Sequence, residues 1–294
     1  MKREFRFALV DAFSTRPLGG NPCSVVFDAD SLTTQEMQAI TREMNQSETA
    51  FVLQSKNFDI KARYFTPERE IPLAGHPTIA MIHAAIENGV LSNEKTEIQL
   101  ELNEGPIKIE IQKSSYGNLI RMFQRKPIFA EVHDPDVVLP IFGLTKSDLL
   151  PNSVIQTVST GTRQLMIAVK SHESLKKLSM NVSLYREYRE KMNFFSPHIF
   201  CLGGIHSDAQ TFARHPGVPP DTLEDAFTGS GTGGMAAFLW KYQFLKKSSF
   251  TAEQGHWMER PGRAFVEVIG SPENIESVIV AGPAVTVVKG QLVL

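Results

Sequence analysis

The sequence predicts a chain of strands and helices folded into two similar halves that face each other. Its 294 residues are about twice the length of a common domain. Apolar runs and two-residue alternation, which are typical of strands, occur throughout. A loop with an acidic residue, a glycine corner and a small-residue helix occurs twice, as EIPLAGHPTIAM from residue 70 and EDAFTGSGTGGM from residue 224. This repeat indicates an internal duplication.

In the first half, helices are expected where apolar residues recur at helical spacing next to capping signals. Thr33 and Glu36 form a capping box that opens one helix. Residues 77–89 predict a second helix, with Pro77 in its first turn and Gly89 past its end. The remaining apolar runs predict strands at 5–13, 21–29, 49–54 and 58–65, and a hairpin over 96–112.

The second half starts after a stretch that we interpret as a linker. Residues 114–145 contain three prolines and a polar segment, which favour irregular structure. Helices are then expected over 171–182 and 234–245. Strands are expected at 154–159, 164–169, 198–204, 264–269, 278–282 and 284–294.

Composition excludes several classes of function. A net charge of −2 provides no basic field for nucleic acid or anionic lipid. No apolar run approaches the roughly 18 residues that a membrane helix needs, and the apolar run within residues 1–13 is too short for a signal peptide. The two cysteines, Cys23 and Cys201, form no metal or redox motif and are expected as buried thiols. We therefore expect a cytoplasmic protein whose partner is a small molecule.

The two glycine corners are candidate anion sites. A helix start presents unpaired N–H groups and the positive end of the helix dipole, and glycine lets a ligand approach the backbone. This interpretation selects Gly75 and His76 at the first corner, and Gly229, Ser230 and Gly231 at the second. Simple helix capping is the alternative. The GSGTGG run also fits a dinucleotide-binding pattern, but no buried strand precedes it, so we disfavour that reading.

Glu48 is the leading candidate for chemistry. It opens an apolar strand, where lost solvation would favour the protonated carboxyl and suit it to proton transfer near neutrality. A hydrogen-bonded structural glutamate is the alternative. His76 and Asp225 could be capping residues or could contact a substrate. The remaining histidines are scattered and form no metal motif, so no metal and no organic cofactor is expected.

Five ordered segments carry a resemblance over nearly the whole chain: VDAFSTRPLGGNPCSVVF, NQSETAFV, RYFTPEREIPLAGHPTIA, EDAFTGSGTGG and QGHWMERPGR. They resemble the PhzF-like family, named for phenazine biosynthesis, whose fold is shared with diaminopimelate epimerase. The resemblance implies an α+β fold with two similar domains, each a barrel-like, mostly antiparallel sheet around a central helix, and an active site between them. We expect one half to comprise 1–117 plus 279–294 and the other 118–278.

By resemblance, Glu48 is the acid/base that moves a proton between carbons, and His76 and Asp225 lie in the pocket. Gly229 and Ser230 would bind an anion, and a homodimer is implied. Diaminopimelate epimerase and proline racemase carry a cysteine at each corner, where this chain has Ala74 and Thr228.

A two-thiol racemase is therefore disfavoured. The hypothesis is a cofactor-independent isomerase acting on a small carboxylate. Dihydro-3-hydroxyanthranilate, the substrate in phenazine producers, is a first candidate, although TGSGTGG differs from the TGSA of those enzymes. The alternative is a non-catalytic carboxylate-binding protein that has kept the cleft.

Overall fold

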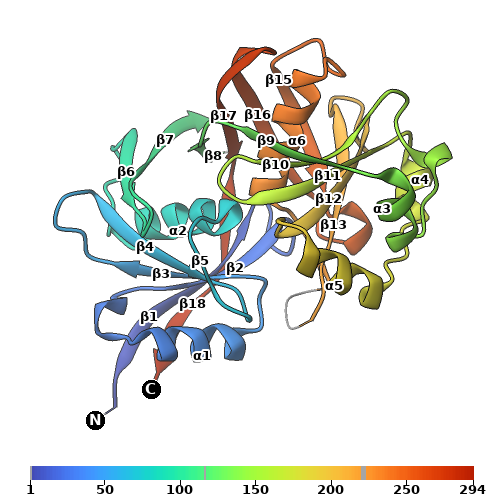
Figure 1. Ribbon diagram of the computed structural model, residues 1–294. Helices are drawn as coiled ribbons and strands as arrows, with labels where there is room; N and C mark the ends of the chain where they lie inside the picture. Colours follow the sequence, from blue (N-terminus) through green and yellow to red (C-terminus); the bar gives the residue numbers. More distant parts are fainter. Residues whose placement is uncertain (1, 116, 220–222) are drawn as a thin grey trace.

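Two lobes, each with a sheet wrapped around one buried helix, make up the computed structural model, which describes residues 2–115, 117–219 and 223–294 (Figure 1). In the first lobe α2 (Gly75–Glu87) contacts β1, β2, β3, β8 and β18. In the second lobe α6 (Gly229–Lys241) contacts β10, β11, β12, β16 and β17. Each helix thus has strands of its own lobe on several sides, as expected for an α+β fold of the epimerase type.

The first lobe is mostly antiparallel. Its parallel pairs are β2 with β3 and β4 with β6, and its other pairs are antiparallel. The helix α1 (Thr34–Met44) begins at the predicted capping box of Thr33 and Glu36. The strands are β1 (Glu4–Ala12), β2 (Asn21–Val26), β3 (Thr49–Leu53), β4 (Ile60–Phe65), β5 (Glu70–Ile71), β6 (Glu97–Glu101), β7 (Ile107–Ser114) and β8 (Gly117–Gln124).

The second lobe repeats this pairing order. Its parallel pairs are β11 with β12 and β13 with β15. The helices α3 (Pro135–Ile141), α4 (His172–Lys176) and α5 (Val182–Lys191) lie outside this sheet (Figure 1). The strands are β9 (Ile128–His133), β10 (Ile155–Ser159), β11 (Arg163–Val169), β12 (Ser196–Leu202), β13 (Thr211–Pro216), β14 (Glu224–Asp225), β15 (Ser249–Gln254), β16 (Gly262–Ser271), β17 (Asn274–Gly282) and β18 (Ala284–Val293), the last of which returns to the first lobe.

Each lobe contains an Arg–Glu ion pair at the same place in its sheet. Arg63 on β4 binds Glu70 on β5 through two hydrogen bonds of 2.8 and 2.7 Å. Arg214 on β13 binds Glu224 on β14 through two of 2.9 and 2.6 Å. Bidentate Arg–carboxylate pairs fix geometry well, so each holds the loop that leads into α2 or α6 in the same way.

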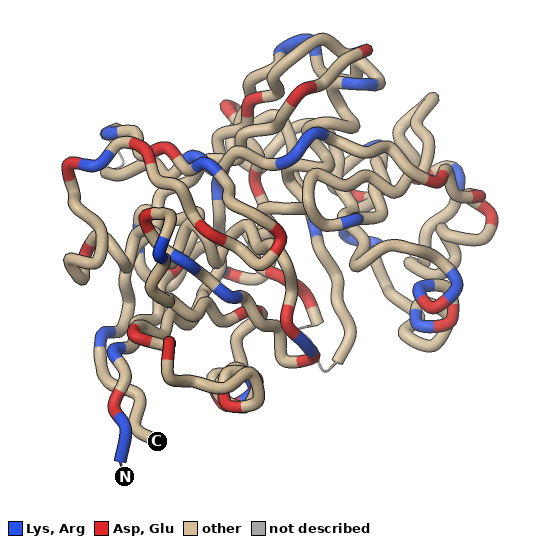
Figure 2. The backbone as a smooth tube through the Cα atoms, turned by 60° about the vertical axis from the view of Figure 1, so that its left-hand side comes forward, with Lys and Arg blue, Asp and Glu red and all other residues tan. Residues whose placement is uncertain are grey.

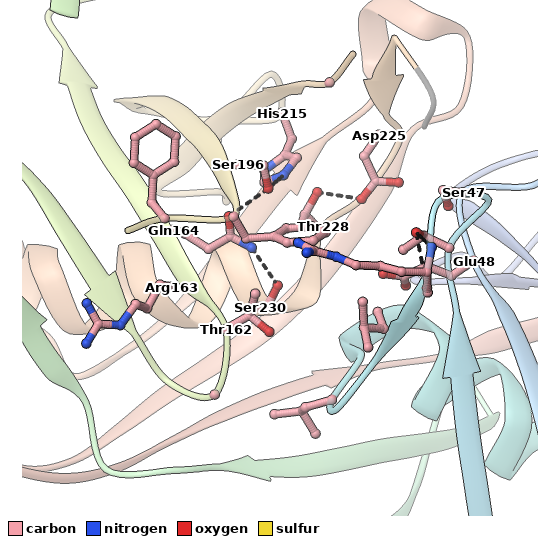
Figure 3. Close-up of a pocket in the computed structure, with 18 of the residues that line it drawn as sticks. Ser47, Glu48, Thr162, Arg163, Gln164, Ser196, His215, Asp225, Thr228 and Ser230 are labelled. Carbon is pink, nitrogen blue, oxygen red and sulfur yellow. Dashed lines mark hydrogen bonds between the residues drawn. The ribbon is translucent and has the colours of Figure 1, made fainter. Parts of the chain in front are cut away.

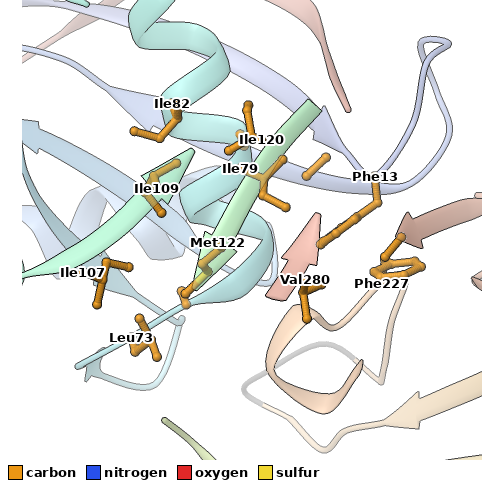
Figure 4. Packing of buried hydrophobic residues seen from close by; sticks show 14 of the residues in the cluster. Phe13, Leu73, Ile79, Ile82, Ile107, Ile109, Ile120, Met122, Phe227 and Val280 are labelled. Carbon is orange, nitrogen blue, oxygen red and sulfur yellow. The ribbon is translucent and has the colours of Figure 1, made fainter. Parts of the chain in front are cut away.

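A strand pairing, the return of the chain in β18 and an aromatic contact are among the features that join the lobes. β17 pairs with β8, so the sheet passes from one lobe into the other. β18 pairs with β1 from Glu4 opposite Val293 onwards, which brings the two chain ends together. The rings of Phe13 and Phe227 stack with their centroids 4.2 Å apart (Figure 4). β8 contacts both lobes, and the exact bounds of the two halves stay a prediction.

Helix α6 is buried because its glycines admit neighbours from the surrounding strands. An added Cβ would lie 2.5 Å from His198 at Gly231, 1.8 Å from Gln124 at Gly233 and 2.5 Å from Met166 at Gly234. The GSGTGG run therefore serves close packing of a central helix. On α2, Ile79 and Ile82 pack with residues of β7 and β8 (Figure 4).

Three sequence predictions need correction. Residues 114–145 are not a linker but contain β8, β9 and α3, because β8 pairs with β7 and β17 and β9 with β10. The helix predicted over 234–245 begins five residues earlier, at Gly229, because burial overrides the poor helix propensity of glycine. The helix predicted over 171–182 is the short α4, and α5 follows it unpredicted. Within the described residues, no helix is long and apolar enough to cross a membrane.

Candidate active site

A cavity of about 460 Å³ lies between the two lobes. Its first-lobe wall is formed by Ser47, Glu48 and the loop over residues 66–73 that leads into α2. Its second-lobe wall comes from four chain segments, at 161–164, 193–196, 215–218 and 225–230, with additional contacts from α5. Interdomain cavities of this size commonly hold small-molecule ligands.

Glu48 lies in the cavity wall directly before β3. Its side chain is 17% exposed, and one carboxylate oxygen is 3.3 Å from Nδ1 of His76, a buried residue in the first turn of α2. Burial lowers the pKa of His76 to about 3, so the imidazole is neutral at neutral pH. A neutral imidazole can hold the carboxylate of Glu48 in place without neutralising it, which leaves that carboxylate able to accept a proton.

Asn21 connects the two lobes behind these side chains. Its Nδ2 lies 2.9 Å from His76 Nδ1 and donates hydrogen bonds to Oδ1 of Asp225 and to the carbonyl of Phe227, both at 2.7 Å. The sequence predicts Asn21 at the start of a strand and indicates no role for it in the site. Asp225 and Phe227 lie more than 200 residues away from Asn21 in the sequence, so no local pattern could have indicated these contacts.

Asp225 lies on β14 in the opposite wall. Burial raises the pKa of its carboxyl to about 6, although hydrogen bonds from Thr228, Asn21 and Ser47 act against the increase. Thr228 Oγ1 donates to Asp225 Oδ2 at 2.6 Å (Figure 3). Asp225 can therefore change protonation state close to physiological pH.

The two helix starts meet back to back at their glycines. A Cβ on Gly75 would lie 2.7 Å from the Cα of Gly229, and one on Gly229 would lie 2.9 Å from the Cα of Gly75. The N-cap of α2 is Ala74, and the N-cap of α6 is Thr228, whose hydroxyl binds Asp225. Neither N-cap side chain occupies the first-turn N–H groups of its helix.

The structure thus assigns different surroundings to the residues selected from sequence. Glu48, Asp225 and Ser230 line the cavity. His76 lies behind Glu48. The three glycines, Gly75, Gly229 and Gly231, are buried against the partner helix or His198 and do not line the cavity.

A chain of hydrogen bonds that the sequence did not reveal runs behind Ser230 (Figure 3). Gln164 donates to Ser230 Oγ at 3.1 Å and accepts from Ser196 Oγ at 2.8 Å. Ser196 Oγ is also 2.7 Å from Nε2 of His215, whose Nδ1 is 3.1 Å from Nδ1 of His198. Burial lowers the pKa of both histidines, of His215 to about 3, so both rings are neutral.

The directions of these bonds determine what Ser230 offers to the cavity. Because the Ser196 hydroxyl donates to Gln164, it must accept from His215 Nε2–H, and His215 Nδ1 must then accept from His198 Nδ1–H. His198 Nε2 is then an acceptor, and it has no hydrogen-bond partner among the described residues. If every hydrogen bond of the chain ran in the opposite direction, His198 Nε2 would carry a hydrogen and would be a buried donor without a partner in the described part of the protein. Buried donors without a partner are rarer in proteins than buried acceptors without one. Ser230 therefore accepts from Gln164 and keeps its own proton free for a ligand.

The thiols lie away from this chemistry. Cys23 and Cys201 are free and buried, and neither lines the cavity. Burial raises the pKa of Cys201 to about 12 and the pKa of Cys23 well above its usual value. Both are therefore protonated thiols at neutral pH and poorly suited to accept a proton from carbon.

The expectation that the remaining histidines are scattered is wrong for the buried pair His198 and His215 and for a second pair nearer the surface. His206 and His256 both approach the buried Glu253, with nitrogen–oxygen distances of 2.7 and 3.9 Å. The same carboxylate accepts from the backbone N–H groups of Ile205 and His206 and lies 3.3 Å from Arg263 Nε. This cluster could offer three ligands to a metal ion, but the guanidinium of Arg263 already provides a positive charge at the carboxylate.

The two-lobed fold and the cavity between its lobes define the class of epimerase-like proteins. Residues 10–290 match the family described as phenazine biosynthesis-like protein, and the chain belongs to this family. It is 34% identical to an uncharacterized isomerase of Clostridium acetobutylicum, with full coverage of both chains. It is 30% identical to the trans-2,3-dihydro-3-hydroxyanthranilate isomerase of Pseudomonas aeruginosa, covering 98% of this chain and 99% of the relative.

Solved structures agree with this assignment. The phenazine biosynthesis protein of the PhzF family from Bacillus anthracis superimposes with a TM-score of 0.88 at 30% identity, covering 99% of both chains. A hydroxyproline epimerase from Agrobacterium vitis shares the fold, with a TM-score of 0.69 at 13% identity over 99% of this chain and 93% of the epimerase. The chain is accordingly an isomerase of the phenazine biosynthesis-like family.

Proposed function

We propose that the protein is a cofactor-independent isomerase that moves a carbon-bound proton on a small carboxylate substrate, with Glu48 as the general acid and base. The observation that carries the proposal is the carboxylate of Glu48 in the cavity wall, oriented by a buried, neutral imidazole at 3.3 Å. Such a carboxylate can accept a proton from carbon and return it to another carbon on the same face of the substrate.

The proton balance requires no group beyond the protein and its substrate. Glu48 takes the proton and becomes a neutral carboxylic acid, while the electron pair of the broken C–H bond delocalises into the adjacent conjugated system. The same acid then protonates a different carbon. Oriented dipoles and hydrogen-bond donors can stabilise the negative charge that develops, so the reaction needs no metal or organic cofactor.

Three groups are proposed to hold the substrate. The free hydroxyl proton of Ser230, in the first turn of α6, suits its carboxylate. Asp225 and His76 would orient it, Asp225 from the opposite wall and His76 through Glu48. The two buried, protonated thiols support a single carboxylate as the proton carrier rather than a pair of cysteines.

The test is solvent deuterium uptake followed by NMR. The first probe is trans-2,3-dihydro-3-hydroxyanthranilate, because the Pseudomonas aeruginosa relative is named for its isomerisation. A panel of small cyclic carboxylates completes the screen. Uptake at a substrate carbon supports the proposal and identifies the substrate class. If compounds bind without exchanging a proton, the proposal is contradicted for those compounds.

Asp225 should make the stability of the protein depend on pH. Because its pKa is raised in the folded state to about 6, the folded state binds more protons than the unfolded state between pH 4 and 6. Stability should therefore fall as pH rises through this window. Urea unfolding of the wild type and of Asp225→Asn at several pH values measures it. Between pH 4 and 6, the free energy of unfolding of the wild type should fall relative to that of Asp225→Asn as the pH rises. A difference between the two proteins that does not change with pH would contradict the prediction.

Gln164→Glu should weaken substrate binding through Ser230. A carboxylate can only accept, so the Ser230 hydroxyl would donate to the introduced carboxylate and no longer to the substrate. The substrate carboxylate would lose its hydrogen bond from Ser230 and would face a second negative charge on residue 164. We therefore expect KM to increase about tenfold, with a smaller change in kcat. Steady-state kinetics measure this with the substrate found above.

A double-mutant cycle with Ser230→Ala provides the control. In the Ser230→Ala background the Gln164→Glu change should cost clearly less than it does alone, because the hydroxyl that it redirects is already absent. Equal and additive losses would show that Gln164 acts independently of Ser230.

The internal duplication, the homodimer and the cytoplasmic location belong to the same proposal. The repeated pairing order and the matching pairs Arg63–Glu70 and Arg214–Glu224 support the duplication. Charged residues of both signs are interspersed along the chain (Figure 2), in agreement with a small-molecule partner rather than nucleic acid.

A further inference from the structure

The cavity opens to the surface beside a second hollow lined with arginines. The two hollows share Arg69, Arg189, Phe194 and Val218. These shared residues therefore lie where the two hollows meet, and we call this place the mouth of the cavity. Among the described residues that line the outer hollow, three are arginines and two are glutamates, so the mouth is positive although the whole chain has a net charge of −2.

Two guanidinium groups at this mouth flank one aromatic ring. Cζ of Arg69 is 5.6 Å from the ring centroid of Phe195, and Cζ of Arg189 is 5.4 Å from it. Arg69 belongs to the loop after β4 in the first lobe, whereas Arg189 is on α5 in the second. Cation–π contacts of this kind hold a guanidinium by its face and leave its in-plane N–H groups available for a ligand.

The positive charge of this pair is poorly neutralised. No ion pair or side-chain hydrogen bond involves the guanidinium of Arg69 within residues 2–115, 117–219 and 223–294. The nearest carboxylate to Arg189 is that of Glu68, at 4.0 Å and well exposed. Glu70 also lines the cavity, but its carboxylate is bound by Arg63 and Asn103. Two like charges beside one ring are unfavourable unless an anion lies near them.

We propose that Arg69 and Arg189 form a second anion subsite, so that the substrate carries two anionic groups. The inference rests on the proposed function, because Ser230 binds the first carboxylate near Glu48. The second group is a carboxylate or a phosphate, since both offer the paired oxygens that a guanidinium fork binds. The positive mouth also attracts a dianion more strongly than a monoanion, an effect that added salt reduces.

Binding of matched probes tests the subsite without requiring turnover. Glutarate and pentanoate have the same five-carbon chain but two and one carboxylates, and 4-phosphonobutanoate replaces the second carboxylate with a phosphonate. Titration calorimetry on the wild type should give at least tenfold tighter binding for a dianion than for pentanoate. Tighter binding of glutarate would indicate that the second group is a carboxylate, and tighter binding of 4-phosphonobutanoate would indicate a phosphate.

Variants assign the preference to the arginines. Arg69→Gln should reduce dianion affinity about tenfold and leave pentanoate unchanged, and Arg69→Lys should restore only part of the loss because lysine lacks the fork. Arg186→Gln is the matched control. Arg186 lines the outer hollow but not the cavity and donates to the carbonyl of Pro219, so its variant should keep most of the preference and lose only the salt-dependent part that the net charge of the mouth provides.

The outcomes separate this inference from the proposed function. Equal affinities for glutarate, 4-phosphonobutanoate and pentanoate, or no binding of any of them at millimolar concentration, would overturn the subsite. If Arg69→Gln weakens the binding of all three probes equally and also lowers the stability of the protein, the contacts of Arg69 and Arg189 with Phe195 serve to hold the lobes together and not to bind an anion. A preserved dianion preference without proton exchange in any compound would leave the subsite and reject the isomerase mechanism.

Discussion

Glu48→Gln is expected to reduce solvent deuterium uptake by the substrate about a thousandfold while changing substrate affinity less than about threefold. General acid–base catalysis typically contributes 10²–10⁴-fold. Glutamine keeps the size of the side chain and can still contact His76 Nδ1, but its amide cannot accept a proton from carbon. Uptake measured by NMR, together with binding by calorimetry, separates loss of catalysis from loss of the site.

A surface glutamate provides the control for this variant. Glu104 is half exposed, pairs with Arg125 and does not line the cavity, so Glu104→Gln should exchange at the wild-type rate. If Glu48→Gln keeps its exchange activity, another group takes the proton and the proposed role of Glu48 is wrong. If wild type and variant bind the same compounds equally and neither exchanges, the non-catalytic alternative gains support.

Local sequence patterns predicted those elements whose cause is local. The capping box at Thr33 and Glu36 is formed. The bounds of α2 were predicted within two residues at each end, because Pro77 near its start and Gly89 near its end are signals within the local sequence. Many strands of the core were predicted for the same reason, since alternation or continuous apolar character follows from burial on one face or two, whereas β8, β13 and β15 were not predicted as strands.

The parts that sequence did not reveal depend on contacts between distant segments. Helix α5 was missed because only Tyr185 among its residues is buried, so the apolar stripe that marks an amphipathic helix is weak. The start of α6 was missed because glycine is a poor helix former, and only the packing of His198, Gln124 and Met166 against it explains why glycine is required.

The candidate site shows the same division. Glu48 and Asp225 could be selected because each lies beside a recognisable strand or corner. The chain from Ser230 through Gln164 and Ser196 to two histidines joins strands β11, β12 and β13 and α6, and its members have no sequence spacing in common. Arg69 and Arg189 were missed because an arginine in a loop or on an exposed helix is usually solvated, and only their shared contact with Phe195 distinguishes them.

Gly75→Ala is expected to lower both stability and activity, because the two helix starts touch through their backbones. The added methyl group would lie 2.7 Å from the Cα of Gly229 and 3.0 Å from the backbone nitrogen of Ser230. Backbone atoms cannot rotate away as a flexible side chain can, so α2 and α6 must separate. Overpacking of this kind typically costs 1–3 kcal/mol, and we expect a loss of about 3 kcal/mol in the free energy of unfolding by urea.

The same displacement should reduce proton exchange at least tenfold. His76 follows Gly75 and Ser230 follows Gly229, so a shift at the contact moves the residue that orients Glu48 and the hydroxyl proposed to bind the substrate. Small misplacements of this size can cost a hundredfold in rate. Gly290→Ala is the matched control, because Gly290 on β18 has open space around the position of a Cβ, and its stability and exchange should stay close to the wild type. Unchanged stability in Gly75→Ala would mean that the helix starts can slide apart freely, and the contact between them would then not be what sets the geometry of the site.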